Sequence, residues 1–188
     1  MATRSRRTDS EEARRAAAAA QIRQFPDPVL KQPARVVEAF DDDLAALAER
    51  MLELMDDAHG AGLAAPQIGL LRRLFVYRPP ETEEPRVLVN PRLVEASAER
   101  AVEGEGCLSL DVLLSAGHQV PVERHERVRL HAVDVAGAPF ELDLAGHEAR
   151  IVQHELDHLD GVLILDRAER AARIDAMRLL RQAIDAEL

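Results

Sequence analysis

The stretch Gln153-His154-Glu155-Leu156-Asp157-His158 lies near the C-terminus of a 188-residue chain and decides which folds suit the sequence. It contains the pattern H-E-x-x-H. Residues four apart lie on one face of a helix, one turn above the other. His154 and His158 can therefore direct two imidazoles at one metal ion, with Glu155 placed to handle protons for an activated water. The alternative is a polar helix with two solvated histidines.

Composition limits the class of protein. The length suits one domain, since about 100–200 residues per domain is usual, and 47% of the residues are apolar, enough for a core. The net charge of −10 argues against a general nucleic-acid binder. No apolar run approaches the roughly 20 residues that span a bilayer. Cys107 is the only cysteine, so no intrachain disulfide can form and a reducing compartment such as the cytoplasm is expected.

Turn residues and apolar periodicity predict one helix and several strands before the motif. The acidic run 41–43 offers helix caps, apolar residues then recur at helical spacing, and Gly60 can end that helix. Short β-rich runs predict strands at 74–77 and 87–89. An alternating apolar and polar pattern on either side of a turn predicts an antiparallel hairpin at 128–133 and 140–144.

The helix that carries the motif lies between Gly146 and Gly161, and a further helix follows it. The pattern predicts an α+β fold, with antiparallel strands around a central helix carrying H-E-x-x-H and a C-terminal helix. We expect residues 25–188 to form a single domain. Residues 1–24, rich in Arg and Ala, are expected to be a mobile tail that can become helical near residues 11–21.

A hydrolytic metal site needs three protein ligands and one open position, so the helix needs a partner. The segment Glu105-Gly106-Cys107-Leu108-Ser109 supplies the only thiolate. Alternatively, Asp166, Glu169 or another downstream carboxylate completes a site like that of zincin metallopeptidases. Cys107 can also be read as a nucleophile or as a small buried core residue.

The glycine-rich segment 60–69 is not a phosphate loop, because it lacks the Gly-Lys-Ser/Thr ending. Its small residues would instead let an extended backbone approach another chain or a substrate. The Gln67 amide could then donate a hydrogen bond to an oxyanion. The alternative is a turn-forming glutamine without a role.

Three motifs in this order resemble those of the peptide deformylase family of bacterial type. They are Gly-Ala-Gly-Leu-Ala-Ala-Pro-Gln at 60–67, Glu-Gly-Cys-Leu-Ser at 105–109 and Gln-His-Glu-Leu-Asp-His-Leu-Asp-Gly at 153–161. The likeness covers about residues 25–185 and implies a deformylase-like catalytic domain over residues 25–188.

The resemblance implies a role for each motif residue. Cys107, His154 and His158 would bind the metal and Glu155 would be the general acid/base. The Gln67 side chain and the Leu108 N–H would stabilise the oxyanion together with the metal. The substrate would bind as an added strand along a set of four residues: Gly62, Ala61, Glu105 and Gly106.

The activity implied is hydrolysis that removes the N-formyl group from the N-terminal formylmethionine of newly made proteins and releases formate. The cofactor would be one divalent ion, most often Fe(II), with Zn, Ni or Co also accepted. The partners would be N-formylmethionyl nascent peptides in the cytoplasm, and weak ribosome docking through the Arg-rich C-terminal helix is a hypothesis. Sequence-specific nucleic-acid binding and membrane binding are not expected. The alternatives are a zincin-type metallopeptidase and a catalytically impaired, deformylase-like binder of formylated N-termini.

The sequence departs from the family pattern after Ser109. The family usually has Pro two residues after this Ser and an Arg soon afterwards. Here Leu110-Asp111-Val112 follows, and no Arg occurs before Arg124. The departure bears on the loop 111–122 beside the substrate and on whether an Arg supports Glu105.

Overall fold

The structure is a computed structural model that describes residues 2–82 and 84–186. Its helices are α1 (Ala2–Ala19), α2 (Asp42–Asp57), α3 (Asp111–Ser115), α4 (Gly146–Leu159), α5 (Ile164–Arg167) and α6 (Arg170–Ala186). Its strands are β1 (Gly62–Ala64), β2 (Leu74–Tyr77), β3 (Arg86–Ala96), β4 (Arg100–Glu105), β5 (Val120–His125), β6 (Arg127–Val133) and β7 (Pro139–Ala145). Three short 3-10 turns are η1 (Pro28–Lys31), η2 (Ala65–Ile68) and η3 (Leu108–Leu110).

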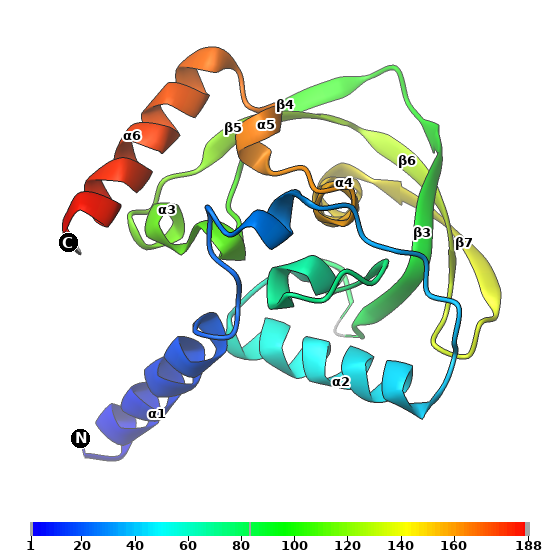
Figure 1. The fold of residues 1–188 in the computed structure, drawn as a ribbon, viewed down its shortest axis with the longest axis horizontal. Helices are drawn as coiled ribbons and strands as arrows, with labels where there is room; N and C mark the ends of the chain where they lie inside the picture. The colour runs from blue at the N-terminus through cyan, green and yellow to red at the C-terminus, as the bar shows by residue number, and fades with distance from the viewer. Residues whose placement is uncertain (1, 83, 187–188) are drawn as a thin grey trace.

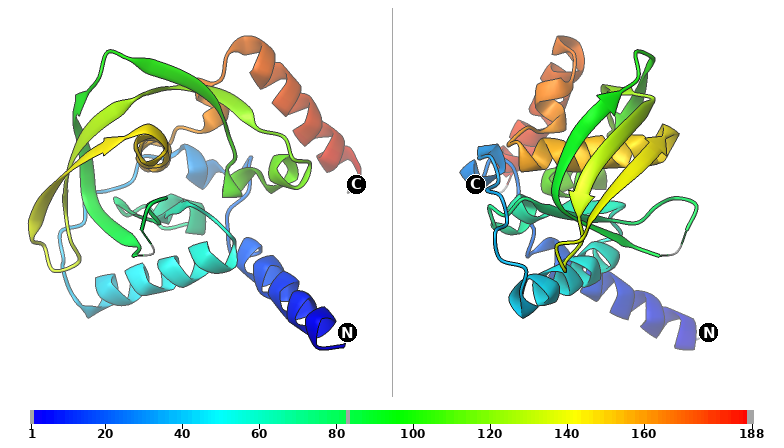
Figure 2. Two further views of the ribbon diagram at one scale, coloured as in Figure 1. Left: turned by 180° about the vertical axis from the view of Figure 1, so that it is seen from behind. Right: turned by 90° about the vertical axis from the view of Figure 1, so that its right-hand side faces the viewer.

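Antiparallel strands curve around α4, which Figure 1 shows end-on near the middle of the molecule. A five-stranded sheet has the order β1-β2-β3-β6-β7, and β4 and β5 form a separate two-stranded sheet. Helix α4 contacts strands of both sheets, and Figure 2 shows the same enclosure from behind. The predicted α+β class, with strands around the motif helix and a C-terminal helix, is confirmed.

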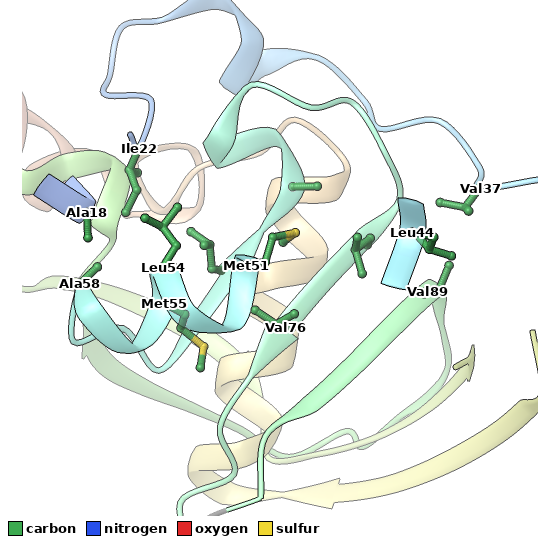
Figure 3. Packing of buried hydrophobic residues seen from close by; sticks show 13 residues of the cluster. Ala18, Ile22, Val37, Leu44, Met51, Leu54, Met55, Ala58, Val76 and Val89 are labelled. Atoms are coloured by element: carbon green, nitrogen blue, oxygen red, sulfur yellow. The ribbon is translucent and has the colours of Figure 1, made fainter. Parts of the chain in front are cut away.

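Helix α2 packs against β1 and β2, on the face of the five-stranded sheet opposite α4. Its N-cap residue Asp41 accepts a hydrogen bond from the Leu44 N–H, as the acidic run predicts. Met51 and Met55 are fully buried and belong to one cluster with Val76 of β2, and this packing is visible in Figure 3. Burying such apolar side chains supplies most of the driving force for this contact.

The predicted hairpin is also present. Strands β6 and β7 pair from Arg127↔Ala145 to Val133↔Pro139. Residues along β6 alternate between buried and more exposed positions. That alternation is what a sheet packed on one face requires.

The N-terminal segment is helical from Ala2 to Ala19, and its far end projects from the body of the molecule (Figure 1). Its inner end is anchored, because Ala18 and Ile22 are buried near Ala58 and Leu54 of the α2 region (Figure 3). Residue 1 of the predicted tail and residues 187–188 of the predicted domain lie outside the described residues. The mobility of residues 1–24 and the domain boundary at 25 stay predictions.

Within the described ranges, every helix is too short or too polar to cross a membrane. Helix α6 lies on the outside of the molecule against α3 and β5. Ala176 and Leu180 form its buried stripe, while Ile174 is 57% exposed.

Candidate active site

Helix α4 places the two histidines of the motif. Its apolar residues Ile151, Val152 and Leu156 pack in the core cluster beneath the large sheet. His154 and His158 lie one turn apart, with ring centroids 5.0 Å apart and planes at 64°. Packing of the apolar side therefore leaves the two imidazoles on a shared face, as the i, i+4 spacing predicts.

The structure brings Cys107 to these histidines. The ligand atoms of Cys107, His154 and His158 all lie within 4.8 Å of one another, and Cys107 Sγ is 3.3 Å from His158 Nε2. Cys107 and His158 are buried, and the His154 side chain is 11% exposed. One thiolate and two imidazoles suit a divalent transition metal and leave a position open for water or substrate.

The two histidines differ in their pKa values. Burial, together with the neighbouring charge of His154, lowers the pKa of His158 well below its usual range. Burial alone would lower the pKa of His154, but hydrogen bonds to Cys107 and Glu105 raise it. Metal ligands must be deprotonated, so a metal ion binding here would displace the His154 proton.

Glu105 orients His154 through the nitrogen opposite the cluster. Its Oε2 lies 2.9 Å from His154 Nδ1. Burial would raise the pKa of Glu105, but hydrogen bonds with His154 and Arg124, and the Arg124 charge, lower it to about 2. A charged carboxylate behind a ligating imidazole fixes the tautomer and ring orientation of that ligand.

Arg124 supplies the arginine support that the departure after Ser109 left open. Its guanidinium donates to both Glu105 oxygens, at 2.9 and 3.0 Å. Its third contact is Asp157 Oδ2 at 2.5 Å. Arg150 adds a further bond to Glu105 Oε1 at 2.9 Å. This buried ionic network joins β4, β5 and α4 beside the cluster of Cys107, His154 and His158.

Sequence reasoning missed Arg124, Arg150 and Asp157. Arg150 stands four residues before His154, so its helical position already placed it on the ligand face. Asp157 lies inside the H-E-x-x-H motif itself. Arg124 carried no local signal, because only the pairing of β4 with β5, Ala101↔Arg124, brings it near Glu105.

Glu155 is buried beside the ligands and is not engaged in the ionic network. Among the residues that the structure describes, its Oε2 has no hydrogen-bond partner. Burial raises the pKa of Glu155 to about 7, although the His154 charge opposes the shift. Gly62 makes room for this carboxyl group, since a Cβ there would lie 2.8 Å from Glu155 Cδ. A buried carboxyl group with such a pKa and one oxygen left without a partner suits general acid/base chemistry near neutral pH.

The orientation of the Gln67 amide is fixed by the backbone. Its Oε1 accepts from the Ala64 N–H at 2.8 Å. Nε2 therefore faces the cluster, 3.2 Å from Ser109 Oγ and 3.9 Å from Cys107 Sγ. The donor end of the amide points where an oxyanion beside the ligands would form.

A cavity of about 270 Å³ opens over this cluster. Nine of the ten site residues predicted from the sequence line it, and His158 does not. The nine are Ala61, Gly62, Gln67, Glu105, Gly106, Cys107, Leu108, His154 and Glu155. A groove of about 500 Å³ over β3, β6 and β7 contains none of them.

The downstream carboxylate of the alternative site is engaged elsewhere. Asp166 pairs with Lys31 and accepts a hydrogen bond from the Leu163 N–H at 2.8 Å. Glu169, the other carboxylate considered, is exposed. The group of ligands that the described residues form contains Cys107 and neither of these acids.

A helix-borne pair of histidines, a cysteine and a buried carboxyl group under a cavity are the groups that a metal-dependent hydrolase uses. Comparisons with known proteins identify which kind of hydrolase this is. The family model for polypeptide deformylase matches residues 19–173. The peptide deformylase of Thermotoga neapolitana is 42% identical over 153 residues, covering 81% of this chain and 89% of that protein. That of Acidothermus cellulolyticus is 44% identical over 162 residues, 86% of each.

Solved structures agree. The crystal structure of a peptide deformylase from Legionella pneumophila superposes with a TM-score of 0.79 at 38% identity, covering 88% of this chain and 95% of that one. The chain belongs to the polypeptide deformylase family. Metal-dependent removal of the N-formyl group from nascent peptides is thus its activity, which places it in protein biosynthesis. The metallopeptidase and the non-catalytic binder are not supported.

Proposed function

We propose that Cys107, His154 and His158 hold one divalent metal ion and that the neighbouring groups perform deformylation around it. When bound, such an ion supplies Lewis-acid activation of water near neutral pH. The observation that carries the proposal is the convergence of the three candidate ligand atoms within 4.8 Å beside Glu155, whose Oε2 has no partner among the described residues. Glu105, held by Arg124, keeps His154 in the orientation that the site needs.

Glu155 is the proton carrier in this proposal. Its carboxylate accepts a proton from the attacking water, and the water oxygen bonds to the formyl carbon. The C–N bond then breaks and Glu155 returns the proton to the departing amine. Water and the formylated N-terminus are consumed, and formate and a free amino terminus are formed.

The Gln67 Nε2 and the Leu108 N–H stabilise the negative oxygen that develops on the formyl group. Leu108 is the first residue of η3, a position whose N–H has no partner inside the turn. The peptide following the formylated residue pairs with the edges formed by Ala61–Gly62 and Glu105–Gly106, which line the cavity.

Release of formate from formyl-Met-Ala-Ser by the metal-loaded protein tests these roles. We expect wild-type turnover, and a fall in kcat of about 10²–10³-fold in Gln67→Ala, the usual effect of removing one oxyanion donor. Metal content should be unchanged in that variant. Turnover within threefold of wild type would refute the role of Gln67.

Fe(II) is the metal that we propose for the cell. A thiolate with two imidazoles accommodates Fe(II), Zn, Ni and Co, so the ligand set alone favours none of them. Fe(II) is the choice implied by the motif resemblance, and the thiolate ligand would make the site sensitive to oxygen. Anaerobic purification from cells followed by metal analysis is the test, and zinc with full activity and no iron would refute it.

We also propose weak docking of α6 on the ribosome, in the cytoplasm where formylated chains emerge. Arg170, Arg173 and Arg181 are exposed on this helix, and arginine side chains bind RNA phosphates. Reversing Arg173 and Arg181 to Glu should reduce co-sedimentation with ribosomes, more so at low salt. Arg127→Glu, far from α6 in sequence and also exposed, is the matched control. Equal co-sedimentation of all variants would refute the docking.

A further inference from the structure

The segment that joins α1 to η1 runs between two of the motif segments. The Arg23 N–H donates to the Gln67 carbonyl at 2.6 Å, and the Phe25 N–H donates to the Ser109 carbonyl at 2.9 Å. Ile22, just before them, is buried in the core cluster of α2, and Figure 3 shows it beside that helix. Residues 22–25 therefore connect the Gln67 segment to the Cys107–Ser109 segment, and the buried Ile22 side chain anchors them to the core.

Gln24 lies in the middle of this segment and binds the backbone of the second motif. Its Nε2 donates to the Leu108 carbonyl at 2.9 Å. Its Oε1 accepts from the Asp111 N–H at 3.0 Å. The residue is exposed, so apolar packing does not account for its position. Two hydrogen bonds across 84 and 87 residues of sequence hold it there, together with a local bond from Nε2 to the Ile22 carbonyl at 3.3 Å.

The hydrogen bonds from Gln24 to Leu108 and Asp111 lie at the two ends of η3. Inside the turn, the Leu110 N–H donates to the Cys107 carbonyl at 2.9 Å. The Cys107 carbonyl and the Leu108 N–H belong to one planar peptide and point in opposite directions. Whatever fixes the turn therefore fixes the direction of the Leu108 N–H, and Gln24 holds the turn at Leu108 and at Asp111.

We propose that Gln24 is a positioning residue for deformylation. It acts through the backbone of η3 to aim the Leu108 N–H at the oxyanion, while the adjacent Arg23 N–H holds the backbone of the second donor, Gln67. This inference rests on the proposed oxyanion roles of Leu108 and Gln67. Gln24 touches neither the metal ligands nor the reacting atoms.

The test compares Gln24→Met, Gln24→Glu and Gln21→Ala with wild type in formate release from formyl-Met-Ala-Ser. Methionine keeps the length of the side chain and removes all three of its hydrogen bonds, those with Leu108 and Asp111 and the local one to Ile22. Glutamate keeps the acceptor for the Asp111 N–H but faces the Leu108 carbonyl with a second acceptor. Gln21 lies three residues earlier and is the matched control, because its side chain bonds to the Ala17 carbonyl and to Arg50 and not to a motif segment among the described residues.

We expect kcat to fall about tenfold in Gln24→Met, less than the roughly 100-fold that a 1 Å misplacement of a catalytic group can cost. Gln24→Glu should fall at least as far, and Gln21→Ala should match wild type. KM, metal content and Tm should stay unchanged in all three. An unchanged kcat in Gln24→Met would overturn the inference, and so would a kcat loss that follows a loss of metal or of Tm. Gln67→Ala, measured in parallel, reports on the proposed function itself, so the two failures are distinguishable.

Discussion

Replacement of Arg124 by methionine tests the ionic network behind the metal ligands. Arg124 is 4% exposed and joins Glu105 to Asp157. Methionine fills a similar volume without charge, so Arg124→Met removes three hydrogen bonds and leaves two buried carboxylates without their shared cation.

The expected loss of folding free energy depends on which arginine partners Glu105 and Asp157 retain. Breaking a buried ion pair by removing one partner usually costs about 3–5 kcal/mol. Glu105 retains Arg150 at 2.9 Å and Asp157 retains Arg167 at 2.6 Å. We therefore expect the lower end, about 3 kcal/mol, which corresponds to a Tm lower by about 6–12 °C for a chain of this size. Metal affinity should also fall by about tenfold, because Glu105 no longer holds His154 firmly.

Thermal unfolding of chelator-treated protein measures the change in Tm, and competition with a chromophoric chelator measures the change in metal affinity. Arg127→Met is the control, because Arg127 and Glu99 form an exposed pair with side chains 62% and 64% accessible. Such pairs contribute little, so its Tm should change by no more than about 2 °C. If Arg124→Met and Arg127→Met unfolded at the same temperature, the reasoning about the buried network would be refuted.

Four further outcomes follow from the site. Glu155→Gln should retain its metal while kcat falls about 10²–10⁴-fold, and near-normal turnover would contradict the proton role. Cys107→Ala should lose both metal and activity, and full metal occupancy by elemental analysis would remove Cys107 from the ligand set. Gly62→Ala should lower kcat/KM strongly at unchanged metal content, because its Cβ would press on the Glu155 carboxyl; steady-state kinetics decide this. The pKa of Glu105 is about 2 in the folded protein against an ordinary value of 4.5. The stability that ionised Glu105 contributes is therefore present above pH 4.5 and is lost as the pH falls toward 2. Urea unfolding of the chelator-treated protein should show this loss of stability in acid, and Glu105→Gln should make the stability depend less on pH over the same range.

Local patterns in the sequence predicted the elements that depend on neighbouring residues. The i, i+4 spacing placed His154 and His158 on one helical face, and alternation predicted the hairpin at 128–133 and 140–144, because both periodicities are properties of a single element. The resemblance of three motifs named Cys107 and Gln67 as partners of that helix. Their proximity could not be read from spacing, since Cys107 lies 51 residues from His158.

The sequence thus determined which chemical groups are available to the proposed site, because the motifs fix the types of the candidate ligands, base and oxyanion donor. Only the tertiary structure decided how those groups are held. Strand pairing brings Arg124 to Glu105, and the chain before η1 brings Gln24 to Leu108. Both contacts join residues far apart in the chain, and a hydrogen bond across such a distance depends on the packed fold rather than on any local pattern.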